Sequence, residues 1–225
     1  MSTATAYPQL SVQHRPIQMD RPVRVLHVVP ELSSGGMERA MLRLVGRSLL
    51  HDRQLVGGSG VVHGICVLNE VKCDLAGDCP PEVPTWVLGS NRRRNRFRSW
   101  RALRGIINGF KPDVVHARST GAWFDAATAV LRFNRVRLLL SFHGRTSVEP
   151  IGWTRRTINR WTTQRACAVL TVSQEAAQML RRELGVPADK LVTVPNGVDT
   201  SLFCPADAEA DVLNMRHRLH LPASA

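Results

Sequence analysis

Short apolar stretches of strand length alternate with amphipathic stretches of helix length along most of this chain. The first, Val23 to Pro30, is almost continuously apolar and rich in valine, as expected for a strand buried on both faces of a parallel sheet. The glycine pair Gly35 and Gly36 follows, and apolar residues then recur at helical spacing from Met37 to Leu50. A strand, a glycine turn and a helix form the opening unit of an α/β fold.

The same alternation continues along the chain, although residues 54–64 are rich in glycine and carry no clear signal. We expect helices over residues 98–110, 122–132, 153–165 and 174–184, and strands over residues 65–68, 83–88, 114–116, 137–142, 168–172 and 191–194. Strands separated by helices require crossover connections, which produce parallel pairing. The predicted fold class is therefore α/β, a doubly wound and mostly parallel sheet with helices on both faces.

The length of 225 residues and the hydrophobic content of 44% suit one large domain. Residues 1–22 are polar and contain three prolines, so we expect a flexible leader and not a signal peptide. The main domain is predicted over residues 23–205, and residues 206–225 are expected to form a linker and the start of a second domain. No apolar run approaches the roughly 18 to 20 residues of a membrane-spanning helix. The five cysteines show no metal-binding spacing, so we expect free thiols in a cytoplasmic protein.

The formal charge of +12 predicts an anionic partner, which at this point is nucleic acid, anionic lipid or a phosphate-bearing small molecule. Part of this charge lies in an arginine–tryptophan cluster, which on a helix places a basic face beside an apolar one. The cluster consists of Arg92, Arg93, Arg94, Arg96, Arg98, Trp100 and Arg101. It favours contact with an anionic membrane or acceptor, and nucleic acid is unlikely because the chain shows no nucleic-acid-binding motif. A solvated arginine-rich face is the alternative.

Gly35 and Gly36 lie where the first predicted strand passes into the first helix. The backbone N–H groups and the positive end of the helix dipole point there into the crevice above the sheet, which suits a phosphate. Glycine would allow the backbone to approach such a ligand closely. A plain tight turn explains the same pair of residues equally well.

His143 follows the strand predicted over residues 137–142, at the carboxyl end of a central strand, where open α/β sheets bind ligands. Its imidazole can donate a hydrogen bond or carry a proton near neutral pH. His116 ends the preceding strand in the same way, so both histidines are candidates for one cleft. We favour His143 because Gly144 leaves room for a ligand, and a histidine that caps a loop is the alternative.

Metal-dependent and covalent chemistry have little support in the sequence. It contains no Asp-x-Asp pair for a divalent ion, no Gly-x-Ser-x-Gly elbow and no Walker loop. We therefore expect neither a metal nor a bound cofactor.

Taken together, four segments in this order resemble the amino-terminal domain of family 4 retaining glycosyltransferases, whose GT-B fold consists of two facing Rossmann-like domains. They are VRVLHVVPELSSGGMERAMLRL, KPDVVHARS, LLLSFHG, and AVLTVSQEAAQML continuing to PNGVDTSLFCP. They cover nearly everything from Val23 to Pro205, and their order and spacing make a chance match improbable.

This resemblance implies metal-independent transfer of a sugar from a nucleotide-sugar donor to an acceptor, with retention of the anomeric configuration, in cell-surface or extracellular glycan synthesis. It places Gly35 and Gly36 beside the donor diphosphate and His143 near the transferred sugar. It also implies that the arginine–tryptophan cluster meets an anionic membrane, peripherally at the inner face of the plasma membrane, or a glycan or lipid-linked acceptor.

The chain departs from the family pattern because the carboxyl-terminal, donor-binding domain is not apparent in it. The family's paired glutamates belong to that domain, and Glu175 and Glu183, which have the same spacing, fall instead on a predicted helix of the first domain. We therefore expect the isolated chain to be inactive, either as a truncated enzyme or as one that works with a separately encoded donor domain. The competing hypothesis is a non-catalytic basic module that binds anionic lipid or nucleic acid.

Overall fold

The computed structural model describes residues 21–54, 60–69, 74–89, 96–144, 152–198, 200 and 209–222. The chain divides into two compact units, residues 1–194 and residues 195–225. The first unit contains the sheet and its helices. In the second, the described residues include the helix α6 (Glu209–Arg218), whose described side chains are mostly exposed.

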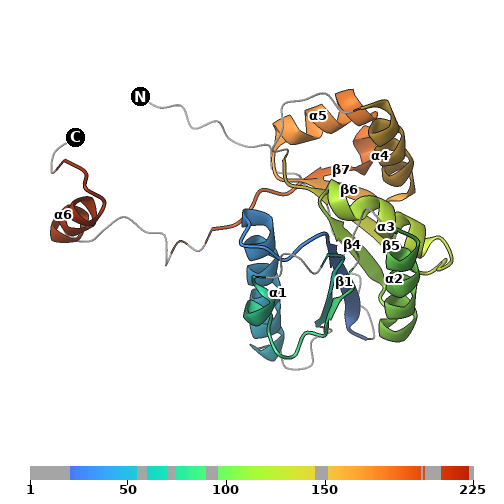
Figure 1. Ribbon diagram of the computed structural model, residues 1–225, viewed down its shortest axis with the longest axis horizontal. Helices are drawn as coiled ribbons and strands as arrows, with labels where there is room; N and C mark the ends of the chain where they lie inside the picture. The colour runs from blue at the N-terminus through green and yellow to red at the C-terminus, as the bar shows by residue number, and fades with distance from the viewer. Residues whose placement is uncertain are drawn as a thin grey trace. The chain divides into compact units, whose positions relative to one another are not determined.

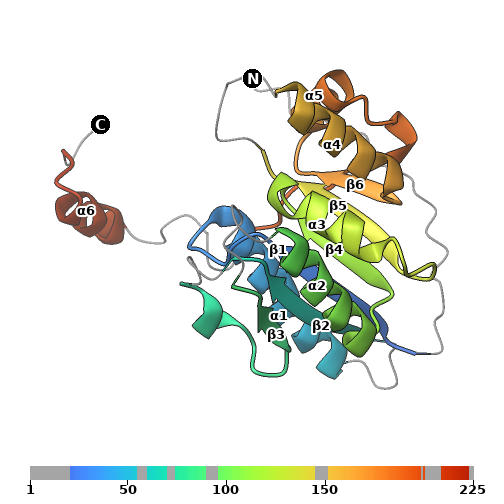
Figure 2. The same ribbon diagram turned by 45° about the vertical axis from the view of Figure 1, so that its right-hand side comes forward.

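A seven-stranded sheet with the strand order β3-β2-β1-β4-β5-β6-β7 forms the centre of the first unit. The strands are β1 (Val23–Val29), β2 (Val61–Val67), β3 (Thr85–Val87), β4 (Val114–Arg118), β5 (Arg137–Phe142), β6 (Ala168–Thr171) and β7 (Leu191–Thr193). All six neighbouring pairs are parallel, which confirms the predicted α/β class. Figure 2 shows the strands fanning from β3 through β4 to β6. The order reverses between β1 and β4, which is the switch point at which doubly wound sheets bind ligands.

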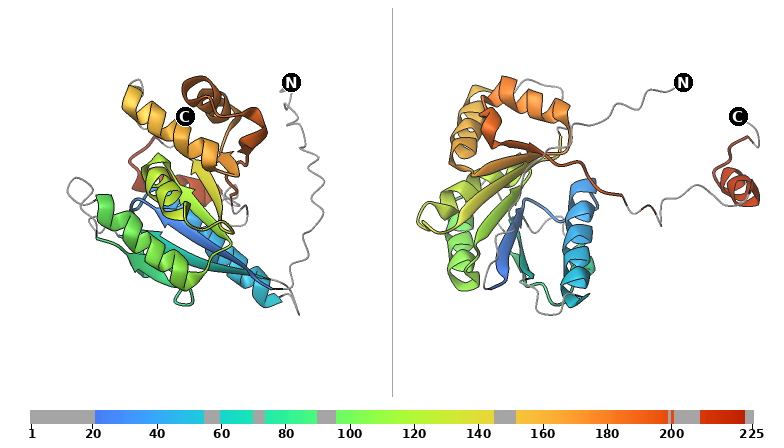
Figure 3. Two further views of the ribbon diagram at one scale, coloured as in Figure 1. Left: turned by 90° about the vertical axis from the view of Figure 1, so that its right-hand side faces the viewer. Right: turned by 180° about the vertical axis from the view of Figure 1, so that it is seen from behind.

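Helices cover both faces of the sheet. They are α1 (Gly36–Gln54), α2 (Arg96–Phe110), α3 (Thr120–Val130), α4 (Trp153–Arg165) and α5 (Gln174–Leu184), with short 3-10 turns at Ala76–Asp78 and Ala188–Lys190. Helix α1 lies on one face of the sheet, and α2 and α3 lie on the opposite face (Figures 1 and 3). The row of helices continues through α4 to α5, because α3 contacts α4 and α4 contacts α5.

Alternating side chains of the strands supply two apolar cores. Leu26 and Val28 of β1 pack with α2 and α3 in the larger core, which includes the fully buried Trp123. Val29 of β1 points to the other face and packs with Met41 of α1 in the smaller core. A strand that must be apolar on both faces explains the continuous valine-rich run at the start of the chain.

Several predicted elements match the structure residue for residue, namely β5, α4 and α5. Strand β2 begins at Val61, four residues before its predicted start, and the glycine that hid it has a structural reason. A Cβ atom on Gly64 would lie 3.0 Å from Phe110 Cζ and 3.1 Å from Trp86 Cζ3, so glycine lets both rings pack directly against the strand. Strand β4 extends two residues beyond its prediction, to Arg118, which pairs with Ser141.

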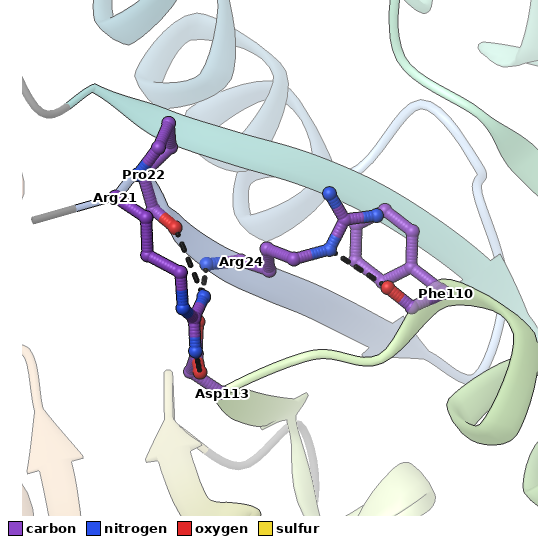
Figure 4. Close-up of polar contacts among 5 residues, drawn as sticks. All are labelled: Arg21, Pro22, Arg24, Phe110 and Asp113. Atoms are coloured by element: carbon purple, nitrogen blue, oxygen red, sulfur yellow. Dashed lines mark hydrogen bonds and ion pairs between the residues drawn. The ribbon is translucent and has the colours of Figure 1, made fainter.

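Polar contacts tie the beginning of β1 to the turn before β4 (Figure 4). The Asp113 carboxylate accepts hydrogen bonds from Arg21 at 2.6 and 2.9 Å and from the backbone N–H of Arg24 at 2.9 Å. The Arg24 Nε donates to the Phe110 carbonyl at 2.8 Å, and the Arg24 guanidinium lies 4.4 Å from the centre of the Phe110 ring. These contacts fix the end of the sheet that lies opposite the carboxyl ends of the strands.

Candidate functional site

The glycine pair lies at the amino-terminal end of α1. Gly36 is the first residue of the helix, and Gly35 precedes it and accepts a hydrogen bond from the Arg39 N–H at 3.1 Å. The nearly buried Glu38 carboxylate lies against Gly35, where any Cβ atom would overlap it. A negative side chain in the first turn of the helix interacts favourably with the helix dipole. The chain's own carboxylate is thus at this corner, and contact with a donor diphosphate remains a prediction.

His143 follows β5 directly, at the carboxyl-terminal edge of the sheet. Its Nε2 is 3.1 Å from the Ser141 hydroxyl, and its Nδ1 is buried without a hydrogen-bond partner among the described residues. Burial, followed by the charge of Arg118, lowers the pKa of His143 to about 4. The imidazole is therefore neutral near pH 7 and can donate or accept a hydrogen bond. The bond to Ser141 fixes how the ring is oriented.

Further histidines line the same face of the sheet, the face on which α1 lies. His27 pairs in register with His116, and their ring centres are 5.6 Å apart. The Nε2 of His27 is 3.0 Å from the Nδ1 of His63, and these two rings stack at 5.3 Å. We refer to His27, His63, His116 and His143 as the histidine cluster. Burial is the main reason that the pKa values of His27 and His116 are lowered well below 6.5, so both are neutral at pH 7.

Arg118 is the last residue of β4 and lies next to the histidine cluster. It is 5% exposed, and its Nε donates to the Nδ1 of His27 at 3.4 Å. Because Nδ1 of His27 accepts this bond, Nε2 carries the proton and donates to His63. Burial lowers the pKa of Arg118 to about 10, whereas a neighbouring carboxylate would have raised it.

The backbone after Arg118 adopts an unusual conformation. Ser119 has φ of 67° and ψ of 154°, a region that residues other than glycine rarely occupy. Its side chain accepts a hydrogen bond from the Gly121 N–H at 3.3 Å and caps α3. Such strain is most common at functional sites, where the surrounding structure holds the backbone in place.

His143 and His116 were predicted from the sequence as site residues, whereas Arg118, His27 and His63 were not. The sequence contains a pattern that points to these residues, because side chains two positions apart on a strand lie on the same face of the sheet. His116 and Arg118 are two apart in β4. Arg118 hydrogen-bonds to His27 of β1, and His27 in turn hydrogen-bonds to His63 of β2. A search for polar residues at alternate positions of buried strands would have found them.

The arginine–tryptophan cluster is described only in part. Arg92, Arg93 and Arg94 lie outside the described residues, and Arg96 and Arg98 belong to α2 but their side chains are not described. Trp100 is half-buried and Arg101 is exposed. Arg104, one turn further along, lies 4.1 Å over the Trp100 ring and donates to the carbonyls of Thr128 and Ala129 at 3.0 and 3.4 Å. The aromatic and basic side chains at this point therefore also join α2 to the end of α3.

An exposed aromatic residue lies at the start of α4. Trp153 is 80% exposed, and the neighbouring Arg155 and Arg156 are also exposed. Arg155 reaches the Thr120 hydroxyl at the beginning of α3, at 3.3 Å. Within the part of the chain that the structure describes, no helix combines the length and the apolar character needed to cross a membrane.

Comparison with solved structures shows what this fold is similar to. A glycosyltransferase from Rickettsia africae matches with a TM-score of 0.65 and 21% identity, over 91% of this chain and 51% of the other. HepE of Anabaena, solved in complex with UDP, matches with a TM-score of 0.66 and 17% identity, over 88% and 50%. The sucrose-phosphate synthase of Thermosynechococcus elongatus matches with a TM-score of 0.65 and 17% identity, over 89% and 53%. The chain thus spans about half the length of each of these proteins.

Family assignment comes from the sequence itself. No curated protein sequence matches the chain significantly. The model of glycosyltransferase family 4 matches residues 63–202, more than half of the chain. The parallel, Rossmann-like sheet agrees with one domain of the GT-B fold, as expected from the resemblance. On these grounds the chain belongs to glycosyltransferase family 4, with the features of an amino-terminal domain.

Proposed function

We propose that this chain is the acceptor-side half of a retaining glycosyltransferase, which transfers a sugar from a nucleotide-sugar donor to an acceptor in glycan synthesis. The observation that carries the proposal is His143, a neutral imidazole held by Ser141 at the carboxyl-terminal edge of a parallel sheet in a family 4 domain. A related fold, HepE of Anabaena, was solved with UDP-glucose, which supports a nucleotide sugar as the donor.

In this proposal His143 contacts the sugar that is transferred. The neutral ring can form a hydrogen bond with a sugar hydroxyl without adding a positive charge beside the reacting carbon. Gly144, directly after the ring, has φ of 106°, a backbone conformation that favours glycine. Catalysis without a metal remains part of the proposal.

A donor-binding domain has to complete the site, since the chain corresponds to about half of each solved protein that it resembles. That domain would come from a separate polypeptide or from a longer form of this protein. The amino-terminal domain contributes His143 from one side of the cleft, and the glycine pair faces the donor diphosphate from the same side.

The proposal is tested by transfer assays with a panel of radiolabelled nucleotide sugars, with the chain alone and with an added donor domain of the same family. We expect transfer only in the second case, and His143→Ala should lower kcat by about 100-fold or more. His51→Ala, which changes an exposed histidine of α1, is the matched control and should have no effect. Efficient transfer by the isolated chain would contradict the half-site model. Full activity of His143→Ala would contradict the role of His143.

We also propose that the protein works at the cytoplasmic face of a membrane, where a lipid-linked acceptor would be presented. Exposed Trp153 with Arg155 and Arg156 is an additional candidate contact beside the arginine–tryptophan cluster, since tryptophan and arginine together suit the surface of an anionic membrane. Flotation with vesicles that contain anionic lipid should retain the wild type and lose a Trp153→Ala, Arg155→Ala, Arg156→Ala variant. Equal retention of both proteins would exclude this contact.

A further inference from the structure

Arg118 is a buried positive charge for which the described residues provide no counter-charge. The guanidinium makes one hydrogen bond among the described residues, the 3.4 Å contact with His27. Its neighbours His27 and His116 are neutral at pH 7, and burial rather than a carboxylate determines the pKa of Arg118. Removing a charge from water costs several kcal/mol unless a partner compensates for it. A group of opposite charge at this position would therefore be strongly stabilised.

A second buried polar atom lies in the same cluster. His116 is 6% exposed, and its Nε2 has no hydrogen-bond partner among the described residues. Almost all buried polar atoms in proteins have a partner, so such an atom requires an explanation. A neutral imidazole such as that of His116 can present an N–H group to an anion.

The position of these groups agrees with a ligand site. Arg118 ends β4, and His143 directly follows β5, the neighbouring strand, so both lie at the carboxyl-terminal edge where open sheets bind ligands. Arg118 pairs in register with Ser141, whose hydroxyl lies 3.1 Å from Nε2 of His143, and His116 lies two residues before Arg118 on the same face of β4. Helix α3 begins just after Arg118, and the amino-terminal end of a helix attracts negative charge.

We propose that Arg118, assisted by His116, binds an anionic group of the acceptor, namely a phosphate or a carboxylate. The planar guanidinium matches the two oxygens of either group. The assignment of the anion to the acceptor rests on the proposed function, whereas the existence of the anion site does not. The donor diphosphate has the same chemistry and is the alternative source of the anion.

The test measures thermal unfolding of the 225-residue chain with increasing inorganic phosphate at constant ionic strength. Phosphate should raise the Tm of the wild type, and Arg118→Met should weaken the apparent phosphate affinity by about tenfold or more. The control variant Arg137→Gln removes an exposed charge from the first residue of β5, at the opposite end of the strand, and should respond like the wild type. An unchanged response in Arg118→Met, or none in the wild type, would overturn the proposal.

Two further measurements keep the test decisive. If Arg118→Met does not fold, NMR spectra of the wild type provide the test. The Nε–H signal of Arg118 and the ring signals of His116 should shift with phosphate, and unchanged signals would overturn the proposal.

Glucose 6-phosphate and UDP then distinguish an anion of the acceptor from an anion of the donor. A rise in Tm with glucose 6-phosphate that is lost in Arg118→Met supports an anionic acceptor. A rise in Tm with UDP alone that is lost in the same variant assigns the anion to the donor. Since these arms need no transfer, an inactive enzyme would refute the proposed function and leave the anion site standing.

Discussion

Acidification from pH 7 to pH 5 should destabilise this protein because of the histidine cluster. The pKa values of His27 and His116 are lowered well below 6.5 in the folded state, mainly by burial, and that of His143 is lowered to about 4. The positive charge of Arg118 faces all three rings and acts in the same direction. In the unfolded chain these histidines take up protons below about pH 6.5. The free energy of unfolding must therefore fall as the pH falls through this range.

The size of the effect follows from the number of protons that the unfolded state gains. A histidine that remains neutral in the folded state costs about 2 kcal/mol of stability between pH 7 and pH 5. The two deeply buried residues, His27 and His116, would together cost up to about 4 kcal/mol, a large part of the total stability of about 5 to 15 kcal/mol of a typical domain. His143 is less buried and contributes less, because solvent screens its charge. Asp113, whose pKa is lowered chiefly by its hydrogen bond with Arg21, contributes only at lower pH.

Urea unfolding monitored by tryptophan fluorescence, in steps of half a pH unit, measures this dependence. His116→Gln should flatten the plot of unfolding free energy against pH by about 1.2 kcal/mol per pH unit between pH 6 and 5. His51→Gln, which removes an exposed histidine from α1, should leave the slope unchanged. An unfolding free energy that stays constant within about 1 kcal/mol from pH 7 to 5 would refute the reasoning. Equal flattening by both variants would also refute it.

Three smaller predictions concern the scaffold. In the same urea assay, Gly64→Ala should lower the free energy of unfolding by about 1 to 3 kcal/mol, because the new Cβ would press against Phe110 and Trp86. The control Gly46→Ala, in an open part of α1, should be neutral or stabilising. Ser119→Gly should stabilise the fold by up to about 1 to 3 kcal/mol, measured by urea unfolding, by relieving its positive φ; a loss of stability would contradict this explanation. Asp113→Ala should lower the free energy of unfolding by about 1 to 3 kcal/mol at pH 7. The difference in unfolding free energy from the wild type should narrow as the pH falls through the lowered pKa of this carboxyl group, and an equal difference at pH 7 and pH 2 would contradict the carboxylate's role.

The sequence predicted the elements whose local pattern agrees with their tertiary role. Helix α5 has clear apolar periodicity and clear ends, namely the Ser173 cap and the left-handed Gly185. Strand β5 is a nearly continuous apolar run, as expected for a strand inside a parallel sheet. Strand β2 was only partly predicted, because Gly64 is unfavourable in an isolated strand. Its reason lies in Phe110 and Trp86, residues that are distant in sequence and that periodicity cannot reveal.

The candidate site was predicted less completely than the fold. His143 and His116 were recognisable because each ends a predicted strand. Arg118 was not, since β4 was expected to end at His116, and a buried arginine is not what a strand pattern indicates. Its significance depends on the distance to His27 and on burial, both of which arise only when β1 and β4 pair.

The pairing of β1 with β4 has a consequence for how the chain folds during synthesis. Val25 pairs with Val114, so the centre of the sheet joins residues 89 positions apart. Closing a loop of this length costs about 4 kcal/mol in chain entropy before any contact is gained. At about 5 to 20 residues per second, a ribosome needs roughly 5 to 18 seconds to pass from one strand to the other. For that interval the apolar face of β1 with Leu26 and Val28 lacks its core, and the growing chain is then most exposed to aggregation and to chaperones.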